Sequence, residues 1–512
     1  LVWTPTADLS VDLRGAASIT NGHSLNFRYI PVELQDDGVT FKRFDFSKPV
    51  SADIVFEDFI SNNIGTDDRD IFEASVKIDY DTPWFTATSI TAYLNLEQMI
   101  TGDQFPYTAF ANPALTLEAG AGFDGTLTQF FDVAAWSQEL RLTSPSDQRL
   151  RWVAGAYFLN TDRFVSLTTG ADLGLGVLPV FREPRGRDTI NPTVTFLGDA
   201  NDNEAYAFYG QINADLTDAI ELTAALRYDK EFRDQRVSPF NETDPGTVNN
   251  KTFDQLQPKV ILRYRPSDTL TLFGSWGIGF RSGIFNQSGT GEAAERVGLT
   301  GIDDVVDEEI TRAFDLGAKW RHPSGLARIQ TTFFRNVIEG QPFFVFVGEV
   351  SAQVVVNIDD VEVIGGEVEA EVQPLDWLQL FAAFGISDTE IRSYEVDPAA
   401  VGNQAPNVPR TTLNLGAQVR QRLPGLAGLV GVARIDYERR GTTYWTPQNS
   451  FPRSALNLVD VRFGIEDSRA RWSLIATIQN ATDALYNTEF AFNGFVHRAP
   501  PRVFRADFRV SF

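Results

Sequence analysis

The chain has 512 residues, with 44 Lys and Arg against 68 Asp and Glu, which gives a formal net charge of -24. Such an acidic chain lacks the basic surface that neutralises phosphates, so nucleic acid is excluded as a partner. It contains no Cys and a single Met, which excludes disulfides, thiolate metal ligands and cysteine nucleophiles. Aromatic residues make up 12% of the chain, yet the mean hydropathy is -0.17 and no run of about 18 apolar residues could form a spanning helix.

The chain opens on "LVW" at residues 1–3, which has the pattern of a strand end running into the turn "TPTAD" at 4–8. Further along, "FEASVKIDY" (72–80) and "IELTAALRYD" (220–229) alternate between apolar and polar residues. A period of two places successive side chains on opposite faces of a strand. Such segments recur as far as the final "FRADFRVSF" (504–512), and they predict about 18 strands after the opening fragment.

Short turns and long connections alternate along the chain. The short turns are rich in turn-forming residues and lie at 4–8, 81–83, 144–149, 216–218, 265–268, 322–325, 373–376, 423–428 and 466–470. Long polar or glycine-rich connections are expected between them, at 18–70, 100–132, 164–203, 235–251, 282–307, 340–360, 392–408 and 441–454, with a last one at 481–501. Successive connections of an up-and-down meander lie at opposite ends, so one end carries tight turns and the other carries large loops. This arrangement is typical of outer-membrane barrels.

Tryptophan placement gives an independent indication. Six of the nine tryptophans lie within three residues of a short turn, where an aromatic girdle at the periplasmic interface should fall: Trp3, Trp84, Trp152, Trp320, Trp377 and Trp472. In hydrocarbon every backbone polar group must be paired, and a sheet achieves this only by closing on itself. The sequence therefore predicts an all-β fold, a transmembrane antiparallel up-and-down β-barrel. The Phe side of residues 504–512 should face lipid, and the Arg and Asp side should face the interior.

Several stretches resemble the barrel of TonB-dependent outer-membrane receptors. Examples are "AYAFYGQINADLTDAIELTAALRYDKE" (205–231), "WSLIATIQNATDALY" (472–486) and the terminal strand that ends in Phe512. Members of that family have barrels of about 22 strands around a plug domain that precedes them in the chain. The resemblance implies that residues 1–512 are the outer-membrane β-barrel domain, with about 18 of about 22 strands present. The plug and roughly the first four strands are expected to be missing from this sequence.

The resemblance also implies the function of an active transporter and receptor in the Gram-negative outer membrane. Such a protein imports a scarce solute, for example an iron-siderophore complex, a vitamin or an oligosaccharide, and is not an enzyme. The expected partners are outer-membrane lipid and lipopolysaccharide, a small-molecule ligand, and the TonB-ExbB-ExbD energising complex through the missing plug. A surface lipoprotein stays open as a further partner. Two alternatives also stay open: a passive 18-stranded porin-like channel, and a non-transport surface barrel for adhesion or partner binding.

Charged residues on the interior side of the strands would hydrate the lumen and dock a plug. They include Lys77, Arg141, Arg227, Glu369, Arg462 and Arg509.

Ligand-binding candidates are aromatic residues of the long connections. They are Phe343, Phe344 and Phe346 in 340–360, Tyr444 and Trp445 in 441–454, and Phe490, Phe492 and Phe495 in 481–501. Exposed aromatic clusters suit a planar or apolar ligand, although loop packing or an outer girdle would also place aromatics there. Arg281, after "WGIGF", is expected at a loop base, where it could pair with an anionic ligand. No catalytic residue, cofactor or metal site is expected. The acidic stretches 199–204 and 301–309 leave Ca²⁺ binding open.

Overall fold

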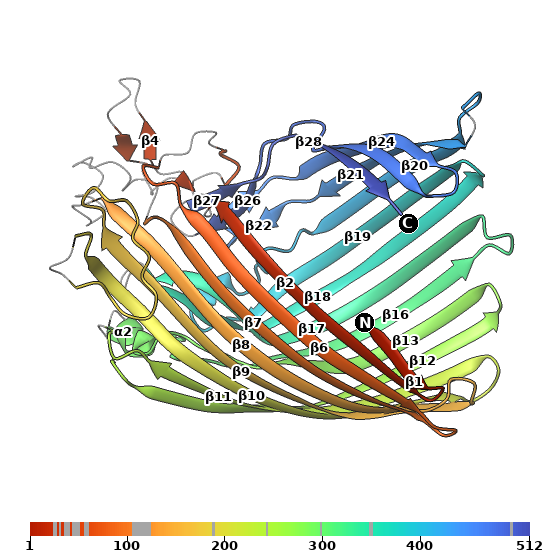
Figure 1. The fold of residues 1–512 in the computed structure, drawn as a ribbon, viewed down its shortest axis with the longest axis horizontal. Coiled ribbons are helices and arrows are strands. Elements are labelled where there is room, and N and C mark those ends of the chain that lie inside the picture. The colour runs from red at the N-terminus through yellow and green to blue at the C-terminus, as the bar shows by residue number, and fades with distance from the viewer. Residues whose placement is uncertain are drawn as a thin grey trace.

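The computed structural model describes the chain except for residues 24–27, 30–31, 35–40, 44–51, 56–60, 105–123, 187–189, 242–243, 297–299, 348–351, 427, 492–494 and 512. A single antiparallel sheet of 19 strands dominates it and curls into the wall of a barrel (Figure 1). This confirms the predicted all-β, up-and-down fold, in which a short opening strand precedes the others. Within the described residues, no helix is long and apolar enough to cross a bilayer.

The strands of the wall follow one another in chain order, each antiparallel to the next. They are β1 (Val2–Thr6), β2 (Leu9–His23), β6 (Thr66–Asp81), β7 (Thr86–Asp103), β8 (Gly125–Thr143), β9 (Leu150–Ala171), β10 (Thr193–Asp215), β11 (Ile220–Val237), β12 (Val248–Ser267), β13 (Leu270–Arg281), β16 (Glu309–Arg321), β17 (Ala327–Val347), β18 (Ala352–Leu375), β19 (Leu378–Ser393), β20 (Thr411–Arg422), β21 (Leu429–Arg440), β24 (Leu456–Asp467), β25 (Trp472–Gln479) and β28 (Val503–Val510).

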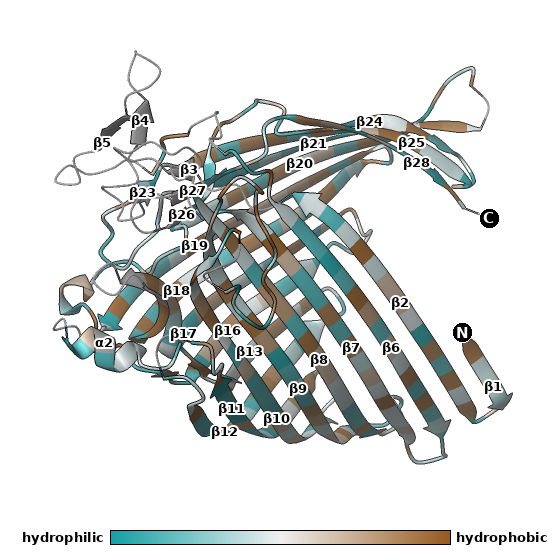
Figure 2. Cartoon of the chain, turned by 60° about the vertical axis from the view of Figure 1, so that its left-hand side comes forward, coloured by the Kyte–Doolittle hydropathy of each residue, from teal (hydrophilic) through white to brown (hydrophobic). Residues whose placement is uncertain are grey.

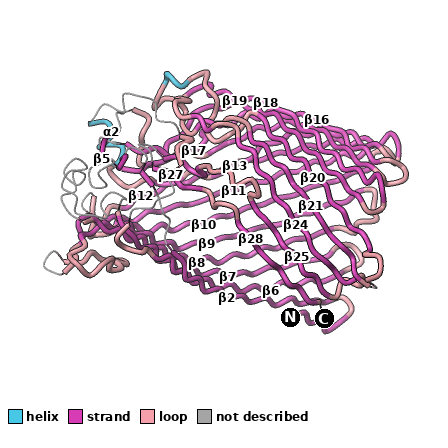
Figure 3. The backbone as a smooth tube through the Cα atoms, turned by 90° about the horizontal axis from the view of Figure 1, so that it is seen from above, coloured by secondary structure: helices cyan, strands magenta, loops and turns pink. Residues whose placement is uncertain are grey.

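Smaller elements lie in the connections. They are β3 (Arg28–Tyr29), β4 (Val32–Leu34), β5 (Phe41–Arg43), β14 (Ile284–Phe285), α2 (Thr290–Arg296), β15 (Val305–Val306), the 3-10 helix Pro398–Ala400, β22 (Thr443–Tyr444), β23 (Pro452–Arg453), β26 (Asn487–Ala491) and β27 (Phe495–Arg498). They form separate two- and three-stranded sheets and two short helices, outside the 19-stranded sheet. Figure 3 shows both helices at the end of the molecule where the long connections gather.

Tight turns gather at one rim of the wall and long connections at the other (Figure 1). The predicted alternation is confirmed at all but one place. Segment 340–360 was expected to be a long loop, but β17 and β18 continue through it and pair as far as Val347 and Ala352. The strands pass Gly340, whose backbone adopts a φ of 70°, a conformation that glycine tolerates without strain. The predicted loop is thus a hairpin that extends the wall.

The two faces of the wall differ in chemistry. Phe504 and Phe508 on β28 are 70% and 67% exposed, and they lie opposite Ile478 and Leu474 of β25. On the other face, charged residues pair along the strands, as in Arg227 with Asp229. Figure 2 shows the resulting alternation of hydrophobic and hydrophilic residues along each strand. The apolar face is the outer one, as the final strand predicted.

The wall has a seam between β28 and the N-terminal strands. Within the described residues, β28 pairs with β25 on one side, and no pairing joins it to β1 or β2. Because neighbouring strands alternate in direction, β1 and β28 run the same way. An all-antiparallel closure would therefore require an odd number of strands between them.

Candidate functional site at the loop rim

Several strands are longer than a membrane requires. The strands β8 to β12, together with β17 and β18, have between 18 and 24 residues. A tilted transmembrane strand needs only about 9 to 11 residues. Their far ends rise beyond the bilayer and support the long connections. The acidic stretch 199–204, expected in a loop, lies inside β10 in such an extension.

One cluster of buried side chains joins the tip of the β17–β18 hairpin to neighbouring connections. We call it the hairpin cluster; its buried members are Ala294, Ile302, Val354, Val356, Ile358, Val361, Ile391, Tyr394, Ala400 and Ala405. Phe343 packs against it, whereas Phe344 is 50% exposed. The cluster therefore gives the loop rim an apolar core of its own.

Asn286 ties the hairpin cluster together by hydrogen bonds. Its Nδ2 donates to the carbonyl oxygens of Asp303 and Val355, each at 2.8 Å. The backbone N–H of Val355 donates back to its Oδ1 at 2.9 Å. The Nε2 of Gln235, on β11, donates to the carbonyl oxygen of Asn286 at 3.0 Å. Asn286 thus links three parts of the structure. Its side-chain amide joins the connection 282–308 to β18, and its backbone carbonyl joins β11.

A second cluster lies where three connections meet, and we call it the mouth cluster. Its buried members are Ala52, Phe490 and Val496, and the partly buried Ile54, Trp445 and Phe451 pack against them. The rings of Phe451 and Phe490 lie 4.9 Å apart. Asn487 holds the first connection in place, since its Nδ2 donates to the carbonyl oxygens of Ala52 and Ile54 at 3.0 and 2.7 Å.

The structure brings some of the predicted ligand-binding residues together and separates others. Trp445 and Phe490 meet in the mouth cluster, and Tyr444, which precedes Trp445, is the last residue of β22. Phe343 and Phe344 belong to the hairpin, in and beside the other cluster. Phe492 lies outside the described residues, as do the side chains of Phe346 and Phe495, whose backbones belong to β17 and β27.

Arg281 lies at the last position of β13, at the loop base where it was expected. Its side chain is 68% exposed, and its Nη1 lies 4.0 Å from Oε2 of Glu309, the residue opposite on β16. An exposed pair at this distance contributes little to stability. The guanidinium of Arg281 is therefore accessible to an anion.

Sequence reasoning did not single out Arg453, on β23. It is only 9% exposed, and its guanidinium carbon lies 5.6 Å from the centre of the Trp445 ring. Its Nη2 donates to Oγ1 of Thr443 at 3.2 Å, but its Nε has no hydrogen-bond partner. The one available signal is the Arg that ends the stretch "YWTPQNSFPR" (444–453), a few residues after its aromatic residues. Its burial depends on side chains from other connections.

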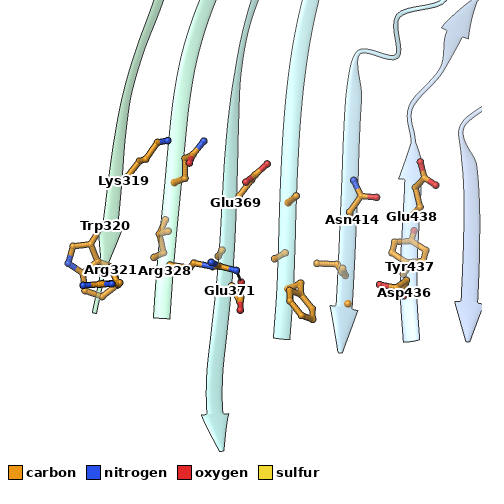
Figure 4. Close-up of a pocket in the computed structure, with 18 of the residues that line it drawn as sticks. Lys319, Trp320, Arg321, Arg328, Glu369, Glu371, Asn414, Asp436, Tyr437 and Glu438 are labelled. Carbon is orange, nitrogen blue, oxygen red and sulfur yellow. Dashed lines mark hydrogen bonds and ion pairs between the residues drawn. The ribbon is translucent and has the colours of Figure 1, made fainter. Parts of the chain in front are cut away.

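The barrel wall contains a cavity of about 750 Å³, whose lining extends to Asp268 and Arg321 beside the tight turns (Figure 4). Charges of both signs line it, among them Lys319, Glu369, Asp436 and Glu438. Arg328 and Glu371 form an ion pair across neighbouring strands, and Nη2 of Arg434 lies 2.7 Å from Oδ1 of Asp436. Such a surface is hydrated and can pair with polar groups of either sign.

Other lumenal charges pair in the same way. Lys77 Nζ lies 2.7 Å from Asp79 Oδ2, and Arg227 Nη2 lies 2.6 Å from Asp229 Oδ1. Glu221 is contacted by three arginines: Arg151, Arg263 and Arg265. In the part of the chain that the structure describes, no group of three or more metal-binding side chains converges.

The match to a family model decides the identity of this barrel wall. The model for the β-barrel of TonB dependent receptor-like proteins matches residues 12–481. The chain belongs to the TonB-dependent receptor family. Receptors of this family are outer-membrane proteins of Gram-negative bacteria and are transporters without enzymatic activity.

Solved structures of TonB-dependent receptors share its fold. The ferric yersiniabactin uptake receptor FyuA from Yersinia pestis is 14% identical with a TM-score of 0.73, over 99% of this chain and 68% of that one. The siderophore receptor PiuA from Acinetobacter baumannii is 15% identical with a TM-score of 0.71, over 97% and 71% of the two chains. The ferric citrate transporter FecA is 13% identical with a TM-score of 0.69, over 100% and 69%.

Proposed function

We propose that this TonB-dependent receptor captures a scarce solute at its loop rim and imports it across the outer membrane with energy from the TonB system. The observation that carries the proposal is the family match over residues 12–481. The arrangement of the wall agrees with it, because all long connections share one rim and can form a single binding surface. The TonB-ExbB-ExbD complex would act through a plug domain.

An iron chelate is the solute class that we propose. The similar structures are named for ferric yersiniabactin, a siderophore and ferric citrate. A vitamin or an oligosaccharide would fit the same architecture, because a barrel scaffold does not determine which solute its loops bind. The aromatic rings at the rim suit the planar or apolar part of a chelate.

The proposed contact residues lie in two places on the rim. Trp445 and Phe490 belong to the mouth cluster and Tyr444 ends β22 beside it, while Phe343 and Phe344 lie on β17 of the hairpin. Arg281 would supply a positive charge at a loop base. Phe346, Phe492 and Phe495 remain candidates from the sequence alone.

The two alternative functions are less well supported. A passive 18-stranded channel would need β28 to close directly on β2, and within the described residues no such pairing is formed. The family match also favours energised import over passive flow or adhesion. Outer-membrane lipid and lipopolysaccharide are the proposed surroundings of the apolar outer face. A surface lipoprotein stays open as a partner.

The test is solute uptake by cells from which the gene has been deleted. The deletion strain and its complemented parent would receive radiolabelled iron on a panel of chelators, labelled cobalamin and labelled maltodextrins. We expect the deletion to abolish uptake of one iron chelate, and the gene to restore it. Equal uptake of every solute by the two strains would contradict the proposal.

A further inference from the structure

The β22–β23 hairpin holds a buried cation in an unusual setting. Thr443 lies opposite Arg453 in this hairpin, and Oγ1 of Thr443 accepts a hydrogen bond from Nη2 of Arg453 at 3.2 Å. The Arg453 Nε is buried and makes no hydrogen bond. With 9% of the residue exposed, water cannot solvate the guanidinium fully.

The acidic groups around Arg453 offset its charge only in part. Glu438 is engaged by Arg440, whose Nε lies 2.6 Å from Glu438 Oε1. Both carboxylate oxygens of Asp53 accept the backbone N–H of Ser454, at 2.9 and 3.2 Å. Burial, and then repulsion from Arg440, lower the pKa of the Arg453 guanidinium below its ordinary value. Within the described residues, no carboxylate forms an ion pair with Arg453, and a buried cation without such a pair is costly.

Two more polar groups of the same hairpin are buried without a partner. They are the indole Nε1 of Trp445 and the hydroxyl of Thr446. The Trp445 ring also lies under the Arg453 guanidinium, at 5.6 Å from its centre. An indole N–H and a guanidinium N–H can only donate hydrogen bonds, whereas a hydroxyl can donate or accept one. An anionic oxygen could accept from all three groups.

We propose that the β22–β23 hairpin binds an oxyanion group of the imported solute, a carboxylate or a phosphate, with Arg453 as its anchor. The link to a solute rests on the proposed import function. The position suits that role, because the hairpin lies in the long connection that begins after Arg440, and Arg440 pairs with Glu438, which lines the cavity (Figure 4). The hairpin therefore lies where the rim opens into the lumen. It would select anionic solutes over neutral and cationic ones.

The test measures oxyanion binding to the purified full-length receptor in detergent. Inorganic phosphate, citrate and ferric citrate would each be titrated by calorimetry at low and high salt. Arg453→Gln removes the charge, and Arg453→Lys keeps it without the planar fork. Arg439→Gln is the matched control, because Arg439 directly precedes Arg440 and so points to the opposite face of β21, where it contacts Asn457.

We expect saturable binding of at least one of these oxyanions, weaker at high salt. Arg453→Gln should weaken it about tenfold or more, since a hydrogen bond to a charged group is lost. The affinity of Arg453→Lys should lie between those of the parent and Arg453→Gln, and the affinity of Arg439→Gln should equal that of the parent. Tighter binding of phosphate would indicate a phosphate group in the solute, and tighter binding of citrate would indicate a carboxylate. Equal affinity in the parent and Arg453→Gln, or no binding of any of the three, would overturn the proposal.

A second variant covers the case in which Arg453→Gln fails to fold. Trp445→Phe keeps an aromatic ring but removes the Nε1 donor, and it should also weaken oxyanion binding. Intact affinity in this variant together with an unfolded Arg453→Gln would show that Arg453 is structural, which contradicts the proposal. Thermal unfolding of each variant reports whether it has folded.

Failure of this inference can be told apart from failure of the import function. If cells with Arg453→Gln take up the solute normally, the anion site is refuted and the import function stands. If oxyanion binding depends on Arg453 but deletion of the gene changes no uptake, the anion site stands and the import function is refuted.

Discussion

At the residue scale, the lumenal wall contains a repeated packing unit that hydropathy does not reveal. An aromatic ring on one strand lies over a glycine directly opposite on the next. The four pairs are Tyr209 with Gly155, Phe273 with Gly317, Phe334 with Gly365, and Phe381 with Gly416. Cations lie over three of these rings, as Lys319 does at 5.5 Å from the centre of Phe273. Aromatic side chains that cover a glycine in this way restore packing that a bare glycine loses.

Replacing one of these glycines should destabilise the barrel. A Cβ at Gly317 would lie 2.4 Å from Cζ of Phe273 and 2.6 Å from the carbonyl oxygen of Thr331. We expect Gly317→Ala to cost about 1 to 3 kcal/mol, the usual range for overpacking. Urea unfolding of the receptor in lipid vesicles would measure this change.

Gly274→Ala on the neighbouring strand is the control for that measurement. A Cβ there would meet its nearest atoms, the carbonyl oxygen of Asp315 and a methyl of Leu316, at 3.8 Å. This variant should unfold at nearly the same urea concentration as the parent. If both glycine variants lose the same stability, the ring contact is not the cause.

The Asn286 amide is the second residue whose role can be tested. Asn286→Ala removes three hydrogen bonds and leaves the N–H and C=O of Val355 without their partner. Each unsatisfied buried group costs about 1 to 3 kcal/mol. We expect faster amide hydrogen exchange at Val355 and in β14 and β15, while the transmembrane strands exchange as before.

Asn250→Ala provides the comparison for Asn286, because the Asn250 side chain lies exposed on β12. Its exchange pattern should match that of the parent. Unchanged protection of Val355 in Asn286→Ala would show that the hairpin cluster holds the connection without the amide.

At the element scale, the sequence predicted the strands well inside the membrane and less well beyond it. Inside, lipid and lumen impose opposite chemistries on the two faces, so the alternation in 220–229 identifies β11 without ambiguity. Beyond the bilayer both faces meet water or loops, and the alternation fades. This is why the pattern predicts loops at residues 199–204, 340–347 and 352–360, although they belong to β10, β17 and β18.

The candidate site shows the same limit. Aromatic content located Trp445 and Phe490, which meet in the mouth cluster although 45 positions separate their numbers, 445 and 490. The sequence could not show that the neighbouring Arg453 is buried without a carboxylate. That property depends on segments as distant as residue 53, which contacts Ser454. Contacts between connections arise from the fold and leave no periodic pattern.

At the scale of the whole molecule, the seam between β28 and β1 bears on the number of strands in the complete barrel. The resemblance to receptors with about 22 strands implies about three strands beyond the 19 of the sheet. Three is an odd number, as an antiparallel closure requires. This strand count and the plug stay predictions.

Ion conductance distinguishes a plugged receptor from an open pore. The full-length receptor in a planar bilayer should conduct almost no current, since a plug would fill the lumen of so wide a barrel. Removal of the plug by gene truncation should open a large, stable conductance. A steady open-channel current from the untruncated receptor would favour the porin-like alternative.

Whether transport is driven by energy can be tested by uptake of the radiolabelled iron chelate that the deletion strain identifies. Uptake would be compared in cells with and without the TonB protein, and before and after collapse of the proton-motive force. We expect binding at the cell surface to persist in every case, while accumulation stops whenever TonB or the proton-motive force is absent. Accumulation that continues without either would contradict energised import.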